Sequence, residues 1–503
     1  MQKRLIFTNA FMSVLQIIVN GIILFFLYRV LLKSLGPEQL GIWSLVLATT
    51  SLINVANFGL SGSVVKFVAK YLARKENENA SKVIQTASIS VAIFIGLALL
   101  IAYPVIRKIL GIVVVSESLH SALLILPFSL LSLLLNSITG VFQSGLDGAQ
   151  RIYLRNLLSM ISAFLYFALC LIFVPLYGLK GAAYSQVLQS GLILFSSWLI
   201  LKKVISELPL IPTKWDKSIF KEIISYGMNF QLISVISMFY DPITKALLSR
   251  FGSLSMVGYY EMANRMVQQF RALIVAANQV LVPFIADLQE KTPKKIKDIY
   301  LTSYQLLFYL SLPMYTSVLI SLPLISRVWI GHYEETFIIF GILVTVGWFL
   351  NTLNVPAYFV NLGTGALKWN VYSHITVGLF NAGLGFLFGF LFNGIGVVTA
   401  WVLSLSLGSS LVYISYHLKN KIPLKELIPE SSRAIFFICV SCVVLSFLFL
   451  QKLNICSLKV TIFSNILAIL LFCIVILIPL YLHPLRRQLI GWGKELMNKK
   501  AGA

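Results

Sequence analysis

The chain has 503 residues, of which 58% are hydrophobic and only 12% are charged, and its mean hydropathy is +0.87. A soluble protein of this size carries about 25% charged residues, so the composition excludes an ordinary soluble enzyme or binding domain. The formal net charge of +22 would suit a nucleic-acid-binding protein, but the chain has no basic stripe and no aromatic–basic RNA motif, and nucleic acid is excluded as a partner.

Fourteen apolar runs follow one another along the chain, separated by short loops. A helix needs about 20 mostly apolar residues to cross the hydrocarbon core of a membrane, and each run has roughly this length or more. We therefore expect an all-α polytopic membrane protein with about 14 transmembrane helices and no folded aqueous domain. The runs are 7–32, 37–60, 83–106, 121–144, 156–177, 179–201, 223–249, 254–286, 298–325, 336–361, 370–393, 395–418, 434–451 and 459–482.

Lysine and arginine are distributed unevenly between alternate loops. If both ends of the chain lie in the cytoplasm, the cytoplasmic segments hold 28 of the 40 Lys and Arg residues, and the outer loops hold eight. Cytoplasmic loops of membrane proteins carry such an excess of positive charge. We therefore predict a multi-pass protein of the inner (plasma) membrane with both termini in the cytoplasm. The first run is too long for a cleaved signal peptide and is expected to remain as a span.

An internal repeat relates the first six runs to the next six. Gly41 pairs with Gly258 at an offset of 217 residues, and Gly181 pairs with Gly396 at an offset of 215. An even number of helices in each half gives both halves the same orientation, as in transporters whose halves are related by an axis along the membrane normal. The predicted organisation is an N-terminal six-helix lobe at 1–201, a cytoplasmic linker at 202–222, a second six-helix lobe at 223–420, and an extra helix pair with a basic tail at 421–503.

Motifs for catalysis and for cofactor binding are missing from the sequence. There is no phosphate-binding G-x-x-x-x-G-K-[ST] loop, no H-E-x-x-H and no G-x-S-x-G. The five cysteines are odd in number and lie within or beside apolar runs, which argues against a disulfide framework. We expect no metal, no cofactor and no catalytic residues, and two six-helix halves favour transport across the membrane over an enzymatic function.

Charged side chains within the apolar runs are the candidate functional residues, because they are costly in lipid and usually face a cavity or a partner. Asp241 and Lys245 are four residues apart, so they lie on one face of a helix and can pair, and Pro242 between them favours a bend. A static ion pair is the alternative for these two residues. The other charged candidates are Arg29, Lys66, Glu261, Arg265 and Arg271, of which Arg29 and Lys66 could simply extend from helix ends to the membrane surface.

Several turns resemble those of the Wzx-type polysaccharide flippases. The stretches that carry the resemblance are Leu32 to Trp43 (LKSLGPEQLGIW), Asn57-Phe58-Gly59-Leu60, Gly148-Ala149-Gln150-Arg151 and Gly258-Tyr259-Tyr260-x-x-Ala263. The resemblance covers roughly residues 1–420, and the final helix pair is also typical of the group. It implies membership of the exporter superfamily that includes the multidrug antiporters and the flippase of the peptidoglycan precursor. The family often has an acid where this chain has Asn57, so no titrating role is expected there.

The resemblance implies that the cargo is an undecaprenyl-pyrophosphate-linked oligosaccharide, moved to the outer leaflet for O-antigen, lipopolysaccharide or capsule assembly by alternating access between two lobes. Its pyrophosphate needs cations in a low-dielectric space, and Arg binds phosphate oxygens bidentately. The predicted substrate contacts are Arg29, Arg265 and Arg271, helped by Lys66 and Lys245, and the predicted residues for gating or ion coupling are Asp241 and Glu261. Membrane lipids are expected partners, and candidate partners are H⁺ or Na⁺ and the polymerase machinery.

Two other functions are open on the sequence alone. A multidrug–cation antiporter of the same fold would need a cavity rich in carboxylates and aromatic rings, whereas this chain has more cations than acids within its helices. A membrane-embedded glycan polymerase or ligase would need a sizeable outer loop for its acceptor sugar, and the longest predicted outer loop, 107–120, is short.

Overall fold

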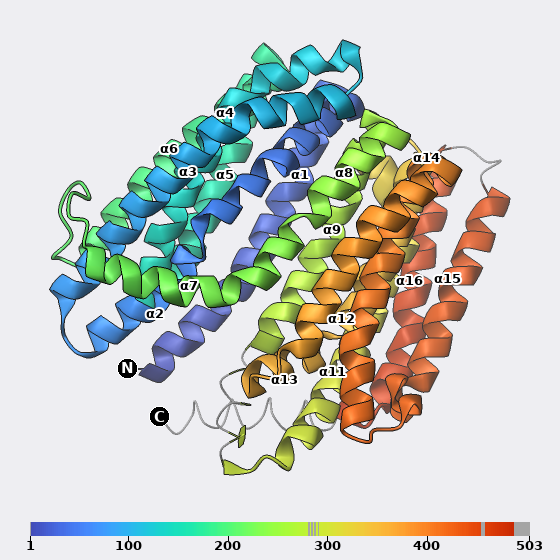
Figure 1. Ribbon diagram of the computed structural model, residues 1–503. Coiled ribbons are helices and arrows are strands. Elements are labelled where there is room, and N and C mark those ends of the chain that lie inside the picture. Colours follow the sequence, from blue (N-terminus) through green and yellow to red (C-terminus); the bar gives the residue numbers. More distant parts are fainter. Residues whose placement is uncertain are drawn as a thin grey trace. The chain divides into compact units, whose positions relative to one another are not determined.

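The computed structural model describes residues 2–279, 291–453 and 458–486, together with residues 282, 285, 288 and 289. Within these residues the regular secondary structure is entirely helical, with no strand (Figure 1). The predicted all-α fold is therefore confirmed. The basic tail that follows Arg486, which was part of the predicted C-terminal region, lies outside the described residues.

Most helices follow the predicted apolar runs, but α2 lies in a stretch predicted as a loop, and the run 336–361 is divided between α12 and α13. In the first half of the chain they are α1 (Gln2–Ser51), α2 (Leu60–Ala73), α3 (Asn77–Val113), α4 (Ser116–Gly148), α5 (Ile152–Tyr177) and α6 (Leu179–Val204), with the short 3₁₀ helix η1 (Leu52–Asn57) after α1. In the second half they are α7 (Lys217–Met238), α8 (Tyr240–Phe251), α9 (Leu254–Gln279), α11 (Lys295–Trp329), α12 (Glu335–Thr352), α13 (Val355–Thr364) and α14 (Lys368–Lys419). The short 3₁₀ helices η2 (Leu424–Leu427) and η3 (Glu430–Ser432) precede the final pair, α15 (Arg433–Leu453) and α16 (Leu458–Leu482).

Three breaks within long helices lie where the sequence predicts boundaries or bends. Helix α1 is interrupted at Gly36, whose φ of 77° is easily adopted by glycine, and α14 is interrupted at Asn393, whose φ is 56°. The run 223–249 is divided between α7 and α8 at Phe239. Pro242 lies in the first turn of α8, where its missing N–H would have had no helical partner, so the predicted bend is present just before it.

Ten segments of the described chain are long and apolar enough to cross a membrane. Two of them, Phe11–Asn57 and Lys368–Lys419, contain the breaks at Gly36 and Asn393, and each spans two of the predicted runs. The two runs without such a segment among the described residues are 223–249 and 254–286, which contain five of the seven charged candidates named above. The chain is a multi-pass membrane protein whose least apolar helices are the ones that carry charge.

Glycines make equivalent helix contacts in the two halves. A Cβ added to Gly181 would overlap the carbonyl oxygen of Phe173, and one added to Gly396 would overlap that of Phe388. The two contacts are separated by the repeat offset, because 173 and 388 differ by the same 215 residues as 181 and 396. The same close turn is therefore built twice, as the internal repeat predicts.

A second glycine contact joins the two halves reciprocally within one compact unit. A Cβ on Gly41 would overlap the carbonyl oxygen of Leu254, and one on Gly258 would overlap that of Pro37. Leu254 is the repeat equivalent of Pro37, as Gly258 is of Gly41. Contacts exchanged in this way are those of two related elements that meet about a local two-fold axis, as expected for an internal repeat.

The chain forms two compact units, one of residues 1–262 with 378–401 and one of residues 263–377 with 402–503. In the first unit, α4 packs on α6 and α1 packs on α5. In the second, α11 packs against α12, α15 and α16. These units are defined by which residues pack together and not by the internal repeat. The predicted boundaries of the two six-helix lobes therefore stay predictions.

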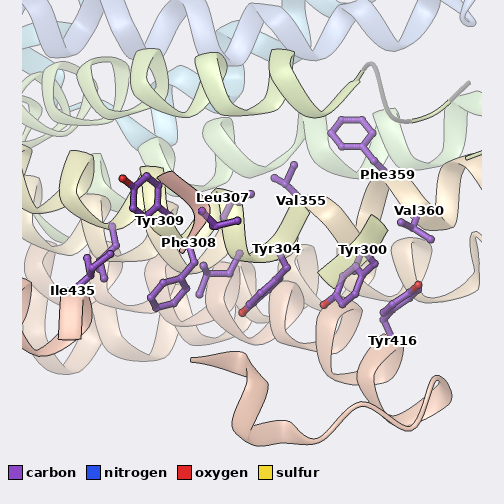
Figure 2. Packing of buried hydrophobic residues seen from close by; sticks show 14 of the residues in the cluster. Tyr300, Tyr304, Leu307, Phe308, Tyr309, Val355, Phe359, Val360, Tyr416 and Ile435 are labelled. Atoms are coloured by element: carbon purple, nitrogen blue, oxygen red, sulfur yellow. The ribbon is translucent and has the colours of Figure 1, made fainter. Parts of the chain in front are cut away.

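Tyrosines of α11 hold the C-terminal helix pair in the second unit (Figure 2). The hydroxyl of Tyr309 donates to the carbonyl of Leu480 in α16 at 2.9 Å, and that of Tyr304 donates to the carbonyl of Leu427 in η2 at 3.1 Å. Apolar residues such as Ile435 of α15 and Phe308 of α11 complete the buried cluster around them. The final helices are thus part of the core of this unit.

Candidate functional site

Lys245 lies at the centre of a buried cluster of charges in the first unit. Its ammonium group forms ion pairs with Asp241 Oδ2 at 2.5 Å and with Glu261 Oε2 at 2.7 Å. The hydroxyl of Tyr28 donates to Glu261 Oε1 at 2.8 Å. The predicted pairing of Asp241 with Lys245 is therefore present, and the cluster links α8, α9 and α1.

The charged groups of this cluster differ in exposure. Lys245 is paired with two carboxylates, one from its own helix and one from α9. The side chains of Lys245 and Glu261 are 2% and 5% exposed, whereas that of Asp241 is 40% exposed, and Asp241 Oδ1 has no hydrogen-bond donor among the described residues. Asp241 is therefore the carboxylate of the cluster whose side chain water can reach, although its Oδ1 atom is buried.

A neutral network holds α8 beside the charge cluster. Asn381 in the first half of α14 donates to the carbonyl of Tyr240 at 3.1 Å and shares a hydrogen bond of 3.1 Å with the hydroxyl of Thr244. Asn381 and Thr244 are both fully buried. Sequence reasoning missed Asn381 and Tyr28, because an isolated amide or phenol in an apolar run does not reveal which distant helix it contacts.

Arg271 of α9 belongs to a separate polar group in the second unit. Its Nε donates to Asn351 Oδ1 of α12 at 2.9 Å, and the guanidinium carbon lies 4.8 Å from the centre of the Trp348 ring. Asn351 in turn donates to Ser409 Oγ at 2.7 Å, and Trp348 Nε1 donates to Asn264 Oδ1 at 2.8 Å. The guanidinium group is therefore fixed along one edge and against one face.

The terminal nitrogens of Arg271 have no acceptor among the residues that the structure describes, and no carboxylate there lies within ion-pair distance. The neighbours that interact with it electrostatically are Tyr315, Tyr358 and His374, none of which is an acid at neutral pH. His374 is partly buried and shares a 3.4 Å hydrogen bond with the hydroxyl of Tyr358. A partly buried cation held in this way can accept an anion from outside the chain.

The structure places the other predicted cations on the surface of their units. Arg29 in α1, Lys66 in α2 and Arg265 in α9 are all exposed. The ammonium group of Lys66 lies 3.7 Å from the centre of the Tyr226 ring in α7. The structure thus brings Asp241, Lys245 and Glu261 together.

Beside Lys66, a surface ion pair fastens α2 to α7. Lys70 Nζ donates to Glu222 Oε1 at 2.8 Å, and the hydroxyl of Tyr71 donates to Glu222 Oε2 at 3.1 Å. The hydrogen bond to the Glu222 carboxylate raises the pKa of Lys70 above its ordinary value. The side chains of Lys70 and Glu222 are both more than one-third exposed, so this contact orients the helices more than it stabilises the fold.

The sequence matches the family described as polysaccharide biosynthesis protein over residues 6–289, which is more than half of the chain. The chain belongs to this family. This polysaccharide biosynthesis protein is 21% identical over 352 residues to a protein of Shigella flexneri described as an O-antigen transporter. That match covers 68% of this chain and 81% of the relative. The resemblance to polysaccharide flippases noted in the sequence is confirmed.

Solved structures of transporters share the fold of this polysaccharide biosynthesis protein. An inward-facing multidrug resistance transporter of the MATE family is 16% identical, with a TM-score of 0.69, over 79% of this chain and 94% of its own. The lipid II flippase MurJ in an inward closed conformation is also 16% identical with a TM-score of 0.69, over 92% of this chain and 97% of its own. A protein from Pyrococcus furiosus described as a transporter of the MOP superfamily with a binding pocket of reverse polarity is 15% identical with a TM-score of 0.58, over 83% and 96% of the two chains.

Proposed function

We propose that this polysaccharide biosynthesis protein is a flippase that moves undecaprenyl-pyrophosphate-linked oligosaccharide repeat units from the cytoplasmic to the outer leaflet for surface polysaccharide assembly, by alternating access. The family match, the likeness to an O-antigen transporter and a fold shared with a lipid II flippase all support this function. We place the protein in the inner membrane with both termini in the cytoplasm, in line with its Lys and Arg distribution.

The observation that carries the proposal is the state of Arg271. A cation that is removed from water is costly unless an anion or a polar cavity accommodates it. Lys245 is neutralised by two carboxylates of the chain itself, but Arg271 has only a neutral amide and an aromatic face as described partners. An anionic cargo supplies the missing charge. A flippase for pyrophosphate-linked glycans has such a cargo.

The remaining candidate residues receive roles consistent with their positions. Arg29, Lys66 and Arg265 are exposed cations that would attract the anionic cargo and contact its phosphates. Lys245 would instead belong to the ion-coupling cluster, because two carboxylates already pair with it. Asp241 and Glu261 would couple transport to H⁺ or Na⁺, because a cation bound to a carboxylate changes the charge that Lys245 faces. Such a cation shifts a conformational equilibrium only by binding its states unequally. Polymerase machinery would receive the cargo at the outer leaflet.

A multidrug antiporter is the second candidate, because the fold is shared with a MATE transporter. Arg271 argues against it, since an unneutralised cation repels a cationic drug. A glycan polymerase or ligase is less well supported still, because both the O-antigen relative and the solved structures are described as transporters or flippases.

The test uses a strain of the source organism in which the chromosomal copy of the gene is deleted. Wild-type protein should restore surface polysaccharide, Arg271→Gln should not, and Arg327→Gln should restore it as a matched control. Arg327 also lies near an aromatic ring, at 5.8 Å from Tyr333, but it is outside the proposed site. Lipid-linked repeat units should accumulate without lengthening in the deletion strain. Normal polysaccharide in the deletion strain, together with increased drug sensitivity, would favour the antiporter instead.

A further inference from the structure

We propose that Arg271 binds a carboxylate on the glycan of the cargo, so that the repeat unit contains a sugar of the uronic acid class. This inference rests on the proposed flippase function and names the chemical group that the second unit recognises. The alternative is that Arg271 binds the pyrophosphate, which all undecaprenyl-pyrophosphate-linked cargoes share. Three features of the site suit a carboxylate, and the second and third favour it over the pyrophosphate.

The first feature is the free edge of the guanidinium group. Asn351 Oδ1 accepts the hydrogen bond from Nε of Arg271, and the hydrogen bond from Asn351 to Ser409 keeps this amide in place. Trp348 lies against one face of the guanidinium. The two terminal nitrogens therefore remain as a planar, pre-oriented pair of donors. Such a pair matches the two oxygens of one carboxylate in a bidentate contact, with little loss of side-chain entropy on binding.

The second feature is the number of charges. Arg271 contributes one positive charge, and its electrostatic neighbours Tyr315, Tyr358 and His374 contribute no permanent one. A carboxylate balances this charge and leaves the site neutral. A pyrophosphate carries more than one negative charge and would bring a net negative charge into a low-dielectric region, which is unfavourable without a second cation. The exposed cations Arg29, Lys66 and Arg265 are more suitable for the pyrophosphate.

The third feature is the chemistry around the donor pair. Trp348 is partly buried, and its Nε1 bond to Asn264 fixes the orientation of the ring. Tyr358 and His374, which are hydrogen-bonded to each other, add a second aromatic surface with polar edges. Aromatic rings with polar edges suit a pyranose, which has both apolar C–H faces and hydroxyl groups. The site therefore has the composition expected for a sugar that carries an acid.

Two matched synthetic probes separate the carboxylate from the pyrophosphate. One is an undecaprenyl-pyrophosphate-linked disaccharide that ends in glucuronate, and the other is its carboxyl-reduced form, which ends in glucose. Binding of each probe is measured by native mass spectrometry on full-length protein. Wild-type protein should bind the acidic probe about tenfold or more tightly than the neutral one, because a charged bidentate hydrogen bond contributes about 1.5–3 kcal/mol.

Variants assign the difference to Arg271. Arg271→Gln should remove the preference for the acidic probe, because it should weaken the binding of that probe only. Arg271→Lys should keep part of the preference, and the control Arg327→Gln should keep all of it. Thermal unfolding verifies that each variant is folded. Equal binding of both probes by wild-type protein overturns the inference. Failure of Arg271→Gln to bind either probe also overturns it, because that result would assign Arg271 to the pyrophosphate. Binding of neither probe by wild-type protein overturns the proposed function itself.

Discussion

Replacing Lys245 by Met should destabilise the protein strongly, because it removes the only cation that is paired with both Asp241 and Glu261 in the described contacts. Removing one partner of a buried ion pair typically costs about 3–5 kcal/mol, since a buried charge is left uncompensated. Most of this cost should come from Glu261, whose side chain is 5% exposed, because water can partly solvate the 40% exposed side chain of Asp241. We therefore expect Lys245→Met to lower the free energy of unfolding by about 3–5 kcal/mol.

The double variant Lys245→Met with Glu261→Gln tests this attribution. The Gln side chain can still accept the hydrogen bond from Tyr28, but it places no charge in the core. The double variant should therefore regain about 2 kcal/mol or more over Lys245→Met alone. Unfolding by SDS titration in mixed micelles measures these differences. A Lys245→Met protein within about 1 kcal/mol of wild type, or a double variant no more stable than the single one, would refute the argument.

Three further predictions concern packing, capping and topology. Gly41→Ala should lower the free energy of unfolding by about 1–3 kcal/mol and impair transport, because the added Cβ would overlap a carbonyl oxygen. In the same unfolding assay the control Gly62→Ala should be neutral, because its Cβ would meet open space. Asp216 accepts hydrogen bonds from two backbone N–H groups at the start of α7, which lowers its pKa below 3.8, so Asp216→Asn should reduce the melting temperature at pH 7. This difference should vanish as the pH falls through the folded-state pKa, because a lowered carboxyl pKa stabilises only the ionised form. Reporter fusions after Lys203 and after Ala503 should both report cytoplasm, and an outer signal at either position would contradict the predicted orientation.

The sequence was sufficient to predict the fold because the membrane restricts the possibilities. Lipid offers no hydrogen-bond partner to backbone N–H and C=O groups, so each long apolar run must be a helix. The turns at Gly36 and Asn393 divide the two longest helices, α1 and α14. The extents of the helices were less predictable. For example, α3 continues to Val113 beyond the predicted end at 106, since interfacial residues outside the hydrocarbon can remain helical without being apolar.

The charge cluster could be predicted only in part, because spacing along one helix says nothing about a neighbouring helix. The four-residue spacing of Asp241 and Lys245 correctly indicated a pair. The participation of Glu261 depends on how α9 packs beside α8, and that of Tyr28 depends on α1. A charge swap of Asp241 and Lys245 is consequently not a neutral exchange, because it would place a carboxylate at position 245 directly against Glu261.

The difference between Lys245 and Arg271 could not be predicted for the same reason, because it depends on which residues of neighbouring helices each cation contacts. In the sequence both are single cations in apolar runs, each equally suitable for binding an anionic cargo. In the structure, carboxylates from two helices already neutralise Lys245, whereas Arg271 is held only by a neutral amide and an indole ring among its described contacts. A cation that the protein itself neutralises gains little from a further anion, while an oriented but unneutralised one gains the full interaction. The charge that this chain leaves uncompensated in its described contacts is therefore the one best suited to recognise its cargo.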